Sequence, residues 1–108
     1  IITRENKLDE LKNALNQIGI SGFTVSPVLG CGIQRGHAAE FFRGSEANVS
    51  FIPKIRVEVV ISEVPLRLVL DTAREVLNTG NIGDGKIFVY SVDDVLRVRT
   101  NEEGPDAL

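Results

Sequence analysis

Two strand–helix–strand units in tandem are the feature of this sequence that most limits how the chain can fold. Apolar residues alternate as in strands over residues 1–3, 23–28, 54–61 and 87–90, and a helical period lies within each pair. Such a tandem folds as a split β-α-β sandwich, with both helices on one face of an antiparallel sheet. The sequence therefore predicts one ferredoxin-like α+β domain over residues 1–108.

Each of the two helical segments carries one apolar stripe at spacings of three and four. We expect the first helix to follow Asn6 as its N-cap and to end at Gly19, and the second to begin at Pro65. Arg67 and Asp71 lie one turn apart outside the second stripe and are expected to pair. The stripe residues are Leu8, Leu11, Leu15 and Ile18, then Leu66, Val69, Ala73, Val76 and Leu77.

The strands carry apolar residues on more than one face. The segment 54–61 is the most regular, with Ile55, Val57, Val59 and Ile61 on one side. Pro27 places the strand 23–28 at an edge or a bulge, and a further short strand is expected at 97–100. Because the helices cover only one face of the sheet, association of subunits is the expected cover for the other.

The segment from Gly30 to Pro53 has neither a helical nor a strand period and contains four glycines. An irregular stretch of about twenty residues in a compact domain indicates a functional loop. Phe41 and Phe42 within it predict a contact surface for a partner, with packing on a neighbouring subunit as the alternative.

The segment Thr79–Lys86, T-G-N-I-G-D-G-K, has the spacing of a Walker phosphate loop but not its context. Ile87 stands where a hydroxyl should hold magnesium, and a helix precedes the segment instead of following it. Gly83 and Gly85 can still adopt positive φ, so that successive N–H groups form an anion-binding concavity with Lys86 at its exit. The alternative is a plain helix-to-strand turn with a solvated lysine.

Further cations could complete such an anion site. Arg97 and Arg99 share one face of the expected strand 97–100, and with Lys86 they form a set that can converge on phosphate. The alternative is a solvated cationic edge. Gln34 and Lys54 bracket the long loop and could hold a small carboxylate or a metal-bound ligand.

The composition excludes several classes of function. A net charge of −3 argues against a general nucleic-acid binder, and no apolar run approaches the roughly 20 residues of a membrane span. A single cysteine, Cys31, cannot form a disulfide framework and fits a reducing cytoplasm. Together with the single histidine, His37, it cannot form a zinc site. No acid–base pair has a defined spacing, so binding is expected and not catalysis.

Six motifs spread over the chain carry a family pattern. They are T-G-N-I-G-D-G-K-I-F-V (79–89), R-V-R-T (97–100), E-E-G-P-D-A-L (102–108), G-C-G-I-Q-R-G-H (30–37), F-R-G-S-E (42–46) and F-I-P-K (51–54). In these motifs the chain resembles the PII nitrogen-regulatory signal proteins of the GlnB/GlnK type. Cys31 and the E-E-G-P-D-A-L ending are most similar to the branch found in Bacillus and related bacteria.

The resemblance implies a homotrimer with a long T-loop at about 33–53 and nucleotide clefts between subunits. The polar composition of the tail at about 101–108 predicts that it is mobile. In the family, ATP and ADP compete for these clefts, and 2-oxoglutarate binds beside Mg-ATP. By position, the implied phosphate contacts are Gly83, Asp84, Gly85, Lys86, Arg97 and Arg99, and the adenosine contacts are Ile2, Thr24, Gly32, Glu58 and Val60. Gln34 would ligate magnesium and contact 2-oxoglutarate, whose site is completed by the backbone at Arg35 and Gly36 and by the side chain of Lys54.

The resemblance also implies how the protein acts on targets. Arg43 and Gly44 match the loop-tip residues that channel-binding members insert into an ammonium channel. A nitrogen transcription regulator and a metabolic enzyme are alternative targets, and no nucleic acid is expected. The protein would be cytoplasmic and would reach the inner face of the membrane only through the channel.

Three positions depart from the family pattern. Ala47 stands where many members have a tyrosine that receives a nucleotidyl group, and Ile33 replaces a common phosphate-binding arginine. Residues 38–42 hold one more residue than the usual spacing. We therefore expect no nucleotidylation of a loop tyrosine.

Two other classes of function compete with a sensor. A slow ATPase or phosphotransferase lacks both the hydroxyl after Lys86 and a base. A binder of single-stranded RNA would use exposed aromatics such as Phe88 and Tyr90, but the net charge of −3 has the wrong sign.

Overall fold

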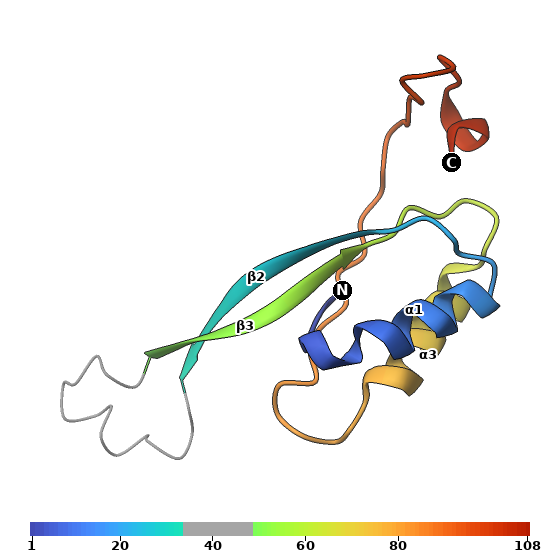
Figure 1. Cartoon of the computed structure of the whole chain (residues 1–108). Coiled ribbons are helices and arrows are strands. Elements are labelled where there is room, and N and C mark those ends of the chain that lie inside the picture. Colours follow the sequence, from blue (N-terminus) through green and yellow to red (C-terminus); the bar gives the residue numbers. More distant parts are fainter. Residues whose placement is uncertain (34–48) are drawn as a thin grey trace.

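The computed structural model describes residues 1–33 and 49–108 of the chain. The strands β1 (Ile2–Thr3), β2 (Thr24–Ile33) and β3 (Val49–Glu58) form an antiparallel sheet with the order β1-β3-β2. The sheet lies beside two helices, α1 (Leu8–Gln17) and α3 (Leu66–Leu77), which pack against each other on the same side (Figure 1). The predicted α+β fold, with helices on one face of an antiparallel sheet, is confirmed. The elements in order are β1 (Ile2–Thr3), η1 (Glu5–Lys7), α1 (Leu8–Gln17), β2 (Thr24–Ile33), β3 (Val49–Glu58), α3 (Leu66–Leu77) and η4 (Gly104–Ala107).

The core lies between the helices and the sheet. Leu11 and Leu15 of α1 are completely buried, and Val57 of β3 is 1% exposed between them and α3. Burying a side chain of this size stabilises the fold by about 1.5–3 kcal/mol. The stripe predicted for α3 is confirmed at Val69, Ala73 and Leu77, which are buried. It is wrong at Leu66, the first residue of α3, which is 43% exposed.

The helix ends follow the sequence signals with one exception. Asn6 is not an N-cap, because η1 precedes α1 and places Asn6 inside a 3-10 turn that begins directly after β1. Gly19 follows the end of α1 with φ of +96°, as expected, and Pro65 is the N-cap of α3, one residue before the first turn in which we expected it. Arg67 and Asp71 form the expected ion pair, at 3.7 Å.

Strands β2 and β3 form one long ribbon. They pair in register from Thr24 with Glu58 to Ile33 with Val49, so the expectation of an irregular segment over Gly30–Pro53 is wrong at both ends. The glycines and Pro53 of this segment interrupt the apolar alternation, so the sequence pattern does not show the strands. They form because β2 and β3 pair with each other through their backbones. Figure 1 shows the ribbon projecting beyond the helices, and β2 is its edge, as Pro27 predicts.

Residues 87–108 form an arm that leaves the domain (Figure 1). The strand expected at 87–90 is absent from the described chain, since β1 offers only two residues and Lys86 already pairs with Ile2. The strand expected at 97–100 is also wrong: the chain reverses there, and the Asn101 N–H donates to the Arg97 carbonyl at 2.8 Å. Asn101 has φ of +63°, a conformation that asparagine tolerates. The tail contains η4, and its mobility stays a prediction.

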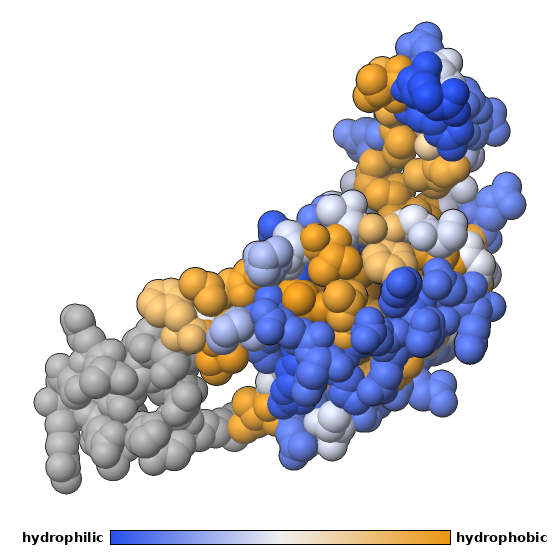
Figure 2. All heavy atoms as spheres, in the orientation of Figure 1, coloured by the Kyte–Doolittle hydropathy of each residue, from blue (hydrophilic) through white to orange (hydrophobic). Residues whose placement is uncertain are grey.

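Apolar side chains remain exposed along the arm and the ribbon. Figure 2 shows them continuing from the ribbon across this face onto the arm. Tyr90 is 73% and Val98 93% exposed, and on the ribbon Phe51 is 68% exposed. A hollow of about 900 Å³ separates the arm from the end of the sheet. One chain therefore leaves a large apolar surface uncovered.

Candidate functional site

The loop that joins α3 to Lys86 is the best-organised polar feature of the described chain. The loop starts at Asn78, the C-cap of α3, whose side-chain oxygen accepts the N–H of Gly80 at 3.0 Å. Gly80 then turns the chain with φ of +80°. Positive φ is found again at Gly83, with +100°, and at Gly85, with +112°, as the sequence predicted for these two glycines.

The carboxylate of Asp84 holds the loop together from inside. It accepts the hydroxyl of Thr79, the N–H of Thr79 at 2.7 Å and the N–H of Gly80 at 3.0 Å. A fourth donor is Arg4, whose Nη1 lies 2.7 Å from Oδ1 in a half-buried ion pair. The Thr79 hydroxyl, together with these N–H groups and the guanidinium, holds the pKa of Asp84 well below its usual range, although desolvation opposes the shift.

Three consecutive carbonyls of the loop accept side-chain donors from the sheet. The donors come from β1, from the residue after it, and from β3. The bonds are Arg4 Nη2 to the Ile82 oxygen at 2.8 Å, Lys54 Nζ to the Gly83 oxygen at 2.7 Å, and Thr3 Oγ1 to the Asp84 oxygen at 2.9 Å. All three donors approach from the side of the sheet.

The carbonyl contacts determine where the loop amides point. In a trans peptide the N–H is antiparallel to the C=O, and the described residues contain no cis peptide bond. The N–H groups of Gly83, Asp84 and Gly85 are therefore directed away from the sheet. Within residues 1–33 and 49–108 these three N–H groups have no acceptor. Three successive free amides in a turn form an anion-binding concavity, which we call the amide nest (residues 83–85).

The position of the amide nest is fixed by β1. Ile2 and Lys86 exchange two backbone hydrogen bonds, of 2.9 and 3.0 Å. A Cβ at Gly85 would lie 2.0 Å from the Ile2 oxygen, so only glycine allows this approach. Lys86 is exposed directly after the nest and lines a hollow of about 430 Å³ with Arg74 of α3. One loop thus carries Gly83, Gly85 and Lys86, which the glycine pattern assigned to an anion. Asp84, which only the resemblance implied as a phosphate contact, lies in the same loop.

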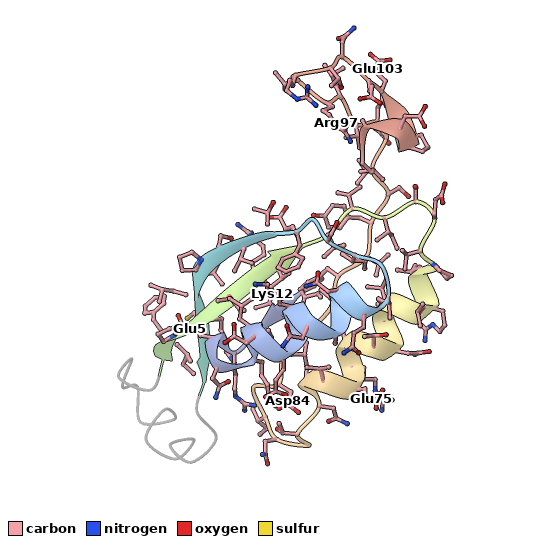
Figure 3. The ribbon with its side chains drawn as sticks, turned by 45° about the vertical axis from the view of Figure 1, so that its right-hand side comes forward. Glu5, Lys12, Glu75, Asp84, Arg97 and Glu103 are labelled. Carbon is pink, nitrogen blue, oxygen red and sulfur yellow. The ribbon has the colours of Figure 1, made fainter. Side chains whose placement is uncertain are left out.

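Arg97 and Arg99 do not join this run within one chain. Figure 3 shows Arg97 on the arm and Asp84 on the loop, at opposite ends of the molecule. Arg97 instead binds Glu102 at 3.2 Å and the Leu108 carbonyl at 3.0 Å. The expected convergence with Lys86 is wrong for a single chain, because 97–100 is a turn on the arm and not a strand of the sheet.

The residues implied for adenosine also divide into two groups. Ile2, Glu58 and Val60 line the 900 Å³ hollow beneath the arm, and Thr24 pairs with Glu58 beside it. Gly32 lies on the same strand as Thr24 but eight residues further along, about 26 Å away at a rise of about 3.3 Å per residue. That separation exceeds the length of an adenosine, so one chain cannot enclose it with both groups.

Several predicted residues lie outside the described residues. They are Gln34, Arg35, Gly36, His37, Phe41, Phe42, Arg43, Gly44 and Ala47. Of the implied 2-oxoglutarate contacts, Lys54 alone is described, and its ammonium group is bound to the Gly83 carbonyl. Thr3, Arg4 and Thr79 were missed by sequence reasoning, and nothing in the local sequence around Thr3 and Arg4 indicates a bond to a loop about eighty residues later.

No group of three His, Cys, Asp or Glu side chains in the described part of the chain could hold a metal ion. None of the described helices has the length and apolarity to cross a membrane.

Comparison with known proteins gives a consistent result. A family model described as "Nitrogen regulatory protein P-II" matches residues 1–102. A "Nitrogen regulatory PII-like protein" of Bacillus subtilis is 44% identical over 108 residues, which cover all of this chain and 92% of the relative. A "Nitrogen regulatory protein P-II" of Rhodospirillum rubrum is 44% identical over 107 residues, covering 99% of this chain and 95% of the relative.

Solved structures of similar proteins share the fold. A structure of the Bacillus subtilis GlnK–ATP complex superimposes with a TM-score of 0.81 at 39% identity, covering 100% of this chain and 92% of that chain. A second structure of Bacillus subtilis GlnK gives the same TM-score at 40% identity, covering 100% and 94%.

Proposed function

Because this chain belongs to the P-II family of nitrogen regulatory proteins, we propose that it senses ATP, ADP and 2-oxoglutarate and transmits their binding to nitrogen-metabolism targets. The observation that carries this proposal is the amide nest of residues 83–85 with Lys86 at its exit. Free amides and an ammonium group are the donors that phosphate oxygens require. Support also comes from the similar GlnK structure in complex with ATP.

The nucleotide site is proposed to lie between subunits of a homotrimer. Two observations support a shared site: Gly32 is too far from Thr24 for both to reach one adenosine, and Arg97 lies far from the nest. In a trimer, the arm of one subunit would supply Arg97 and Arg99 to the nest of its neighbour. The same association would cover the exposed apolar residues of the arm.

Magnesium and 2-oxoglutarate are proposed to bind at the two roots of the long loop, Gln34 and Lys54. Proteins hold Mg²⁺ with few of their own oxygens, together with substrate phosphates. Here the side-chain oxygen of Gln34 is the proposed protein ligand. The donors assigned to 2-oxoglutarate are the backbone at Arg35 and Gly36 and the ammonium group of Lys54. Lys54 already binds the carbonyl of Gly83, so the same side chain contacts both proposed sites.

The regulatory step is proposed to be binding of an ammonium channel by Arg43 and Gly44. The guanidinium on its long stem can enter a narrow pore and bind carbonyls there. If 2-oxoglutarate binds only a conformation in which the loop roots are drawn in, it must weaken any partner that needs the loop extended, because coupling is reciprocal. The protein would then be cytoplasmic and recruited to the membrane by its partner.

Titration with ATP in a calorimeter tests the nucleotide site. Lys86→Ala is expected to weaken ATP binding by at least about 1.5 kcal/mol, or about tenfold, which is the lower value for a charge-assisted hydrogen bond. Lys12→Ala, which removes an exposed lysine of α1, is the matched control and should bind as the wild type does. Failure of the wild-type protein to bind ATP would reject the proposal.

A pull-down with ammonium-channel membranes tests the regulatory step. Binding is expected in ADP and should be lost in Mg-ATP with 2-oxoglutarate, and Arg43→Ala should not bind in either condition. Equal retention of the wild-type protein in both conditions contradicts the switch.

A further inference from the structure

We propose that Arg4 and Asp84 form a positioning pair that directs the amides of residues 83–85 toward the nucleotide phosphates, without contacting the nucleotide themselves. The inference rests on the proposed function and changes the role of Asp84, which the family resemblance implied as a phosphate contact. It also gives Arg4 a role that the motif pattern did not indicate.

The carboxylate of Asp84 is turned into the loop. Oδ1 contacts Arg4 and the hydroxyl of Thr79, while Oδ2 accepts the N–H groups of Thr79 and Gly80. The side chain is only 19% exposed. A carboxylate aimed at a phosphate would repel it. The observed orientation avoids this repulsion, because the negative charge lies against Arg4, behind the backbone that carries the free amides.

The guanidinium of Arg4 acts through its fork. Nη1 binds the Asp84 carboxylate at 2.7 Å and Nη2 binds the Ile82 carbonyl at 2.8 Å. One rigid group therefore fixes a side chain and a peptide two residues apart. Lysine carries the same charge but has no planar fork, and it cannot reproduce both bonds in this geometry. The charge of Arg4 is matched by Asp84, so its effect on a phosphate must come from the orientation of the peptides.

The pair can be tested by separating charge from geometry. We would compare wild type, Arg4→Lys, Arg4→Gln and Asp84→Asn in ATP affinity by calorimetry and in the NMR order parameters of the Gly83 and Gly85 amides. Lys12→Gln is the control for the loss of one positive charge, since Lys12 is an exposed lysine of α1 that lines neither hollow. The melting temperature of each variant reports whether the fold is retained.

Arg4→Lys and Arg4→Gln are both expected to weaken ATP binding about tenfold or more. The order parameters of the two glycine amides should fall from about 0.85, the rigid value, toward 0.6 in the free protein. Asp84→Asn should also weaken binding, with the same loss of order, and Lys12→Gln should match the wild type in every readout.

Four other results would contradict the positioning role of Arg4 and Asp84, and each can be distinguished from the others. If Arg4→Lys binds ATP as the wild type does, charge suffices and the positioning role is wrong. If affinity falls while the order parameters stay at the wild-type value, Arg4 contacts the nucleotide directly. Tighter binding by Asp84→Asn would mean that the carboxylate faces the phosphate. A wild-type protein that binds no ATP rejects the proposed function, and the pair with it.

Discussion

The substitution Gly85→Ala should break the connection between the loop and β1. The new Cβ would lie 2.0 Å from the Ile2 oxygen and 3.0 Å from the Ile2 carbonyl carbon, and both atoms belong to the backbone of a paired strand. Relieving the clash requires opening the two hydrogen bonds between Ile2 and Lys86, each worth about 0.5–1.5 kcal/mol. The φ of +112° adds about 1–2 kcal/mol for a residue with a Cβ. We therefore expect a loss of about 2–5 kcal/mol in the free energy of unfolding.

Gly80→Ala is the control for this substitution. Gly80 has φ of +80°, but a Cβ there would meet nothing within 4 Å. The control therefore has only the conformational cost of positive φ, about 1–2 kcal/mol. The difference between the two variants isolates the approach of Gly85 to Ile2.

Urea unfolding at one fixed protein concentration measures both variants against the wild type. A fixed concentration is needed because association of subunits would itself add to the apparent stability. A loss of 2–5 kcal/mol is a large part of the roughly 5–15 kcal/mol that stabilises an ordinary domain. If Gly85→Ala is no less stable than Gly80→Ala, the clash with Ile2 is absent and the bridge does not fix the loop.

Three further predictions concern assembly, pH and modification. Light scattering at micromolar concentration should give three times the chain mass of 11.8 kDa, and a monodisperse monomer contradicts the trimer. Because the pKa of Asp84 is lowered in the fold, its contribution to stability is present above its unfolded pKa of about 4 and is lost as the pH falls further. Asp84→Asn should therefore lose less stability than the wild type below about pH 4, and equal acid sensitivity of the two proteins counts against this role. Intact mass spectrometry of protein from nitrogen-starved cells should show no added nucleotide, since Ala47 has no hydroxyl, and an adduct on residues 33–53 would overturn this prediction.

The sequence predicted those parts of the fold that depend on local pattern. The stripes that bury Leu11 and Leu15, the alternation around Ile55 and Val57, and the turn at Gly83 and Gly85 all follow from spacings within a few residues. A strand, in contrast, depends on a partner. Residues 87–90 have strand propensity but no strand to pair with in the described chain. The ends of β2 and β3, in contrast, pair with each other despite their glycines and Pro53.

The candidate site shows the same division. The glycines and Lys86 were visible as a motif, because their spacing is local. The bond between Arg4 and Asp84 joins residues 80 positions apart, and no period or motif connects them. Thr3 and Lys54 reach the loop over 81 and 29 positions for the same reason. The atoms that would bind a phosphate could thus be predicted, whereas those that hold the loop required the structure.

Lys54 connects the ribbon to the loop that carries the amide nest. Its side chain donates to the loop carbonyl of Gly83, and it lies five positions from Val49 at the far end of β3. At about 3.3 Å per residue, the part of β3 from Lys54 to Val49 is about 17 Å long. A tilt of about 10° at Lys54 would therefore displace Val49 by about 3 Å. If Lys54 exchanged its hydrogen bond to the Gly83 carbonyl for one to another acceptor, a small tilt at Lys54 would move the end of the ribbon by about the length of a hydrogen bond.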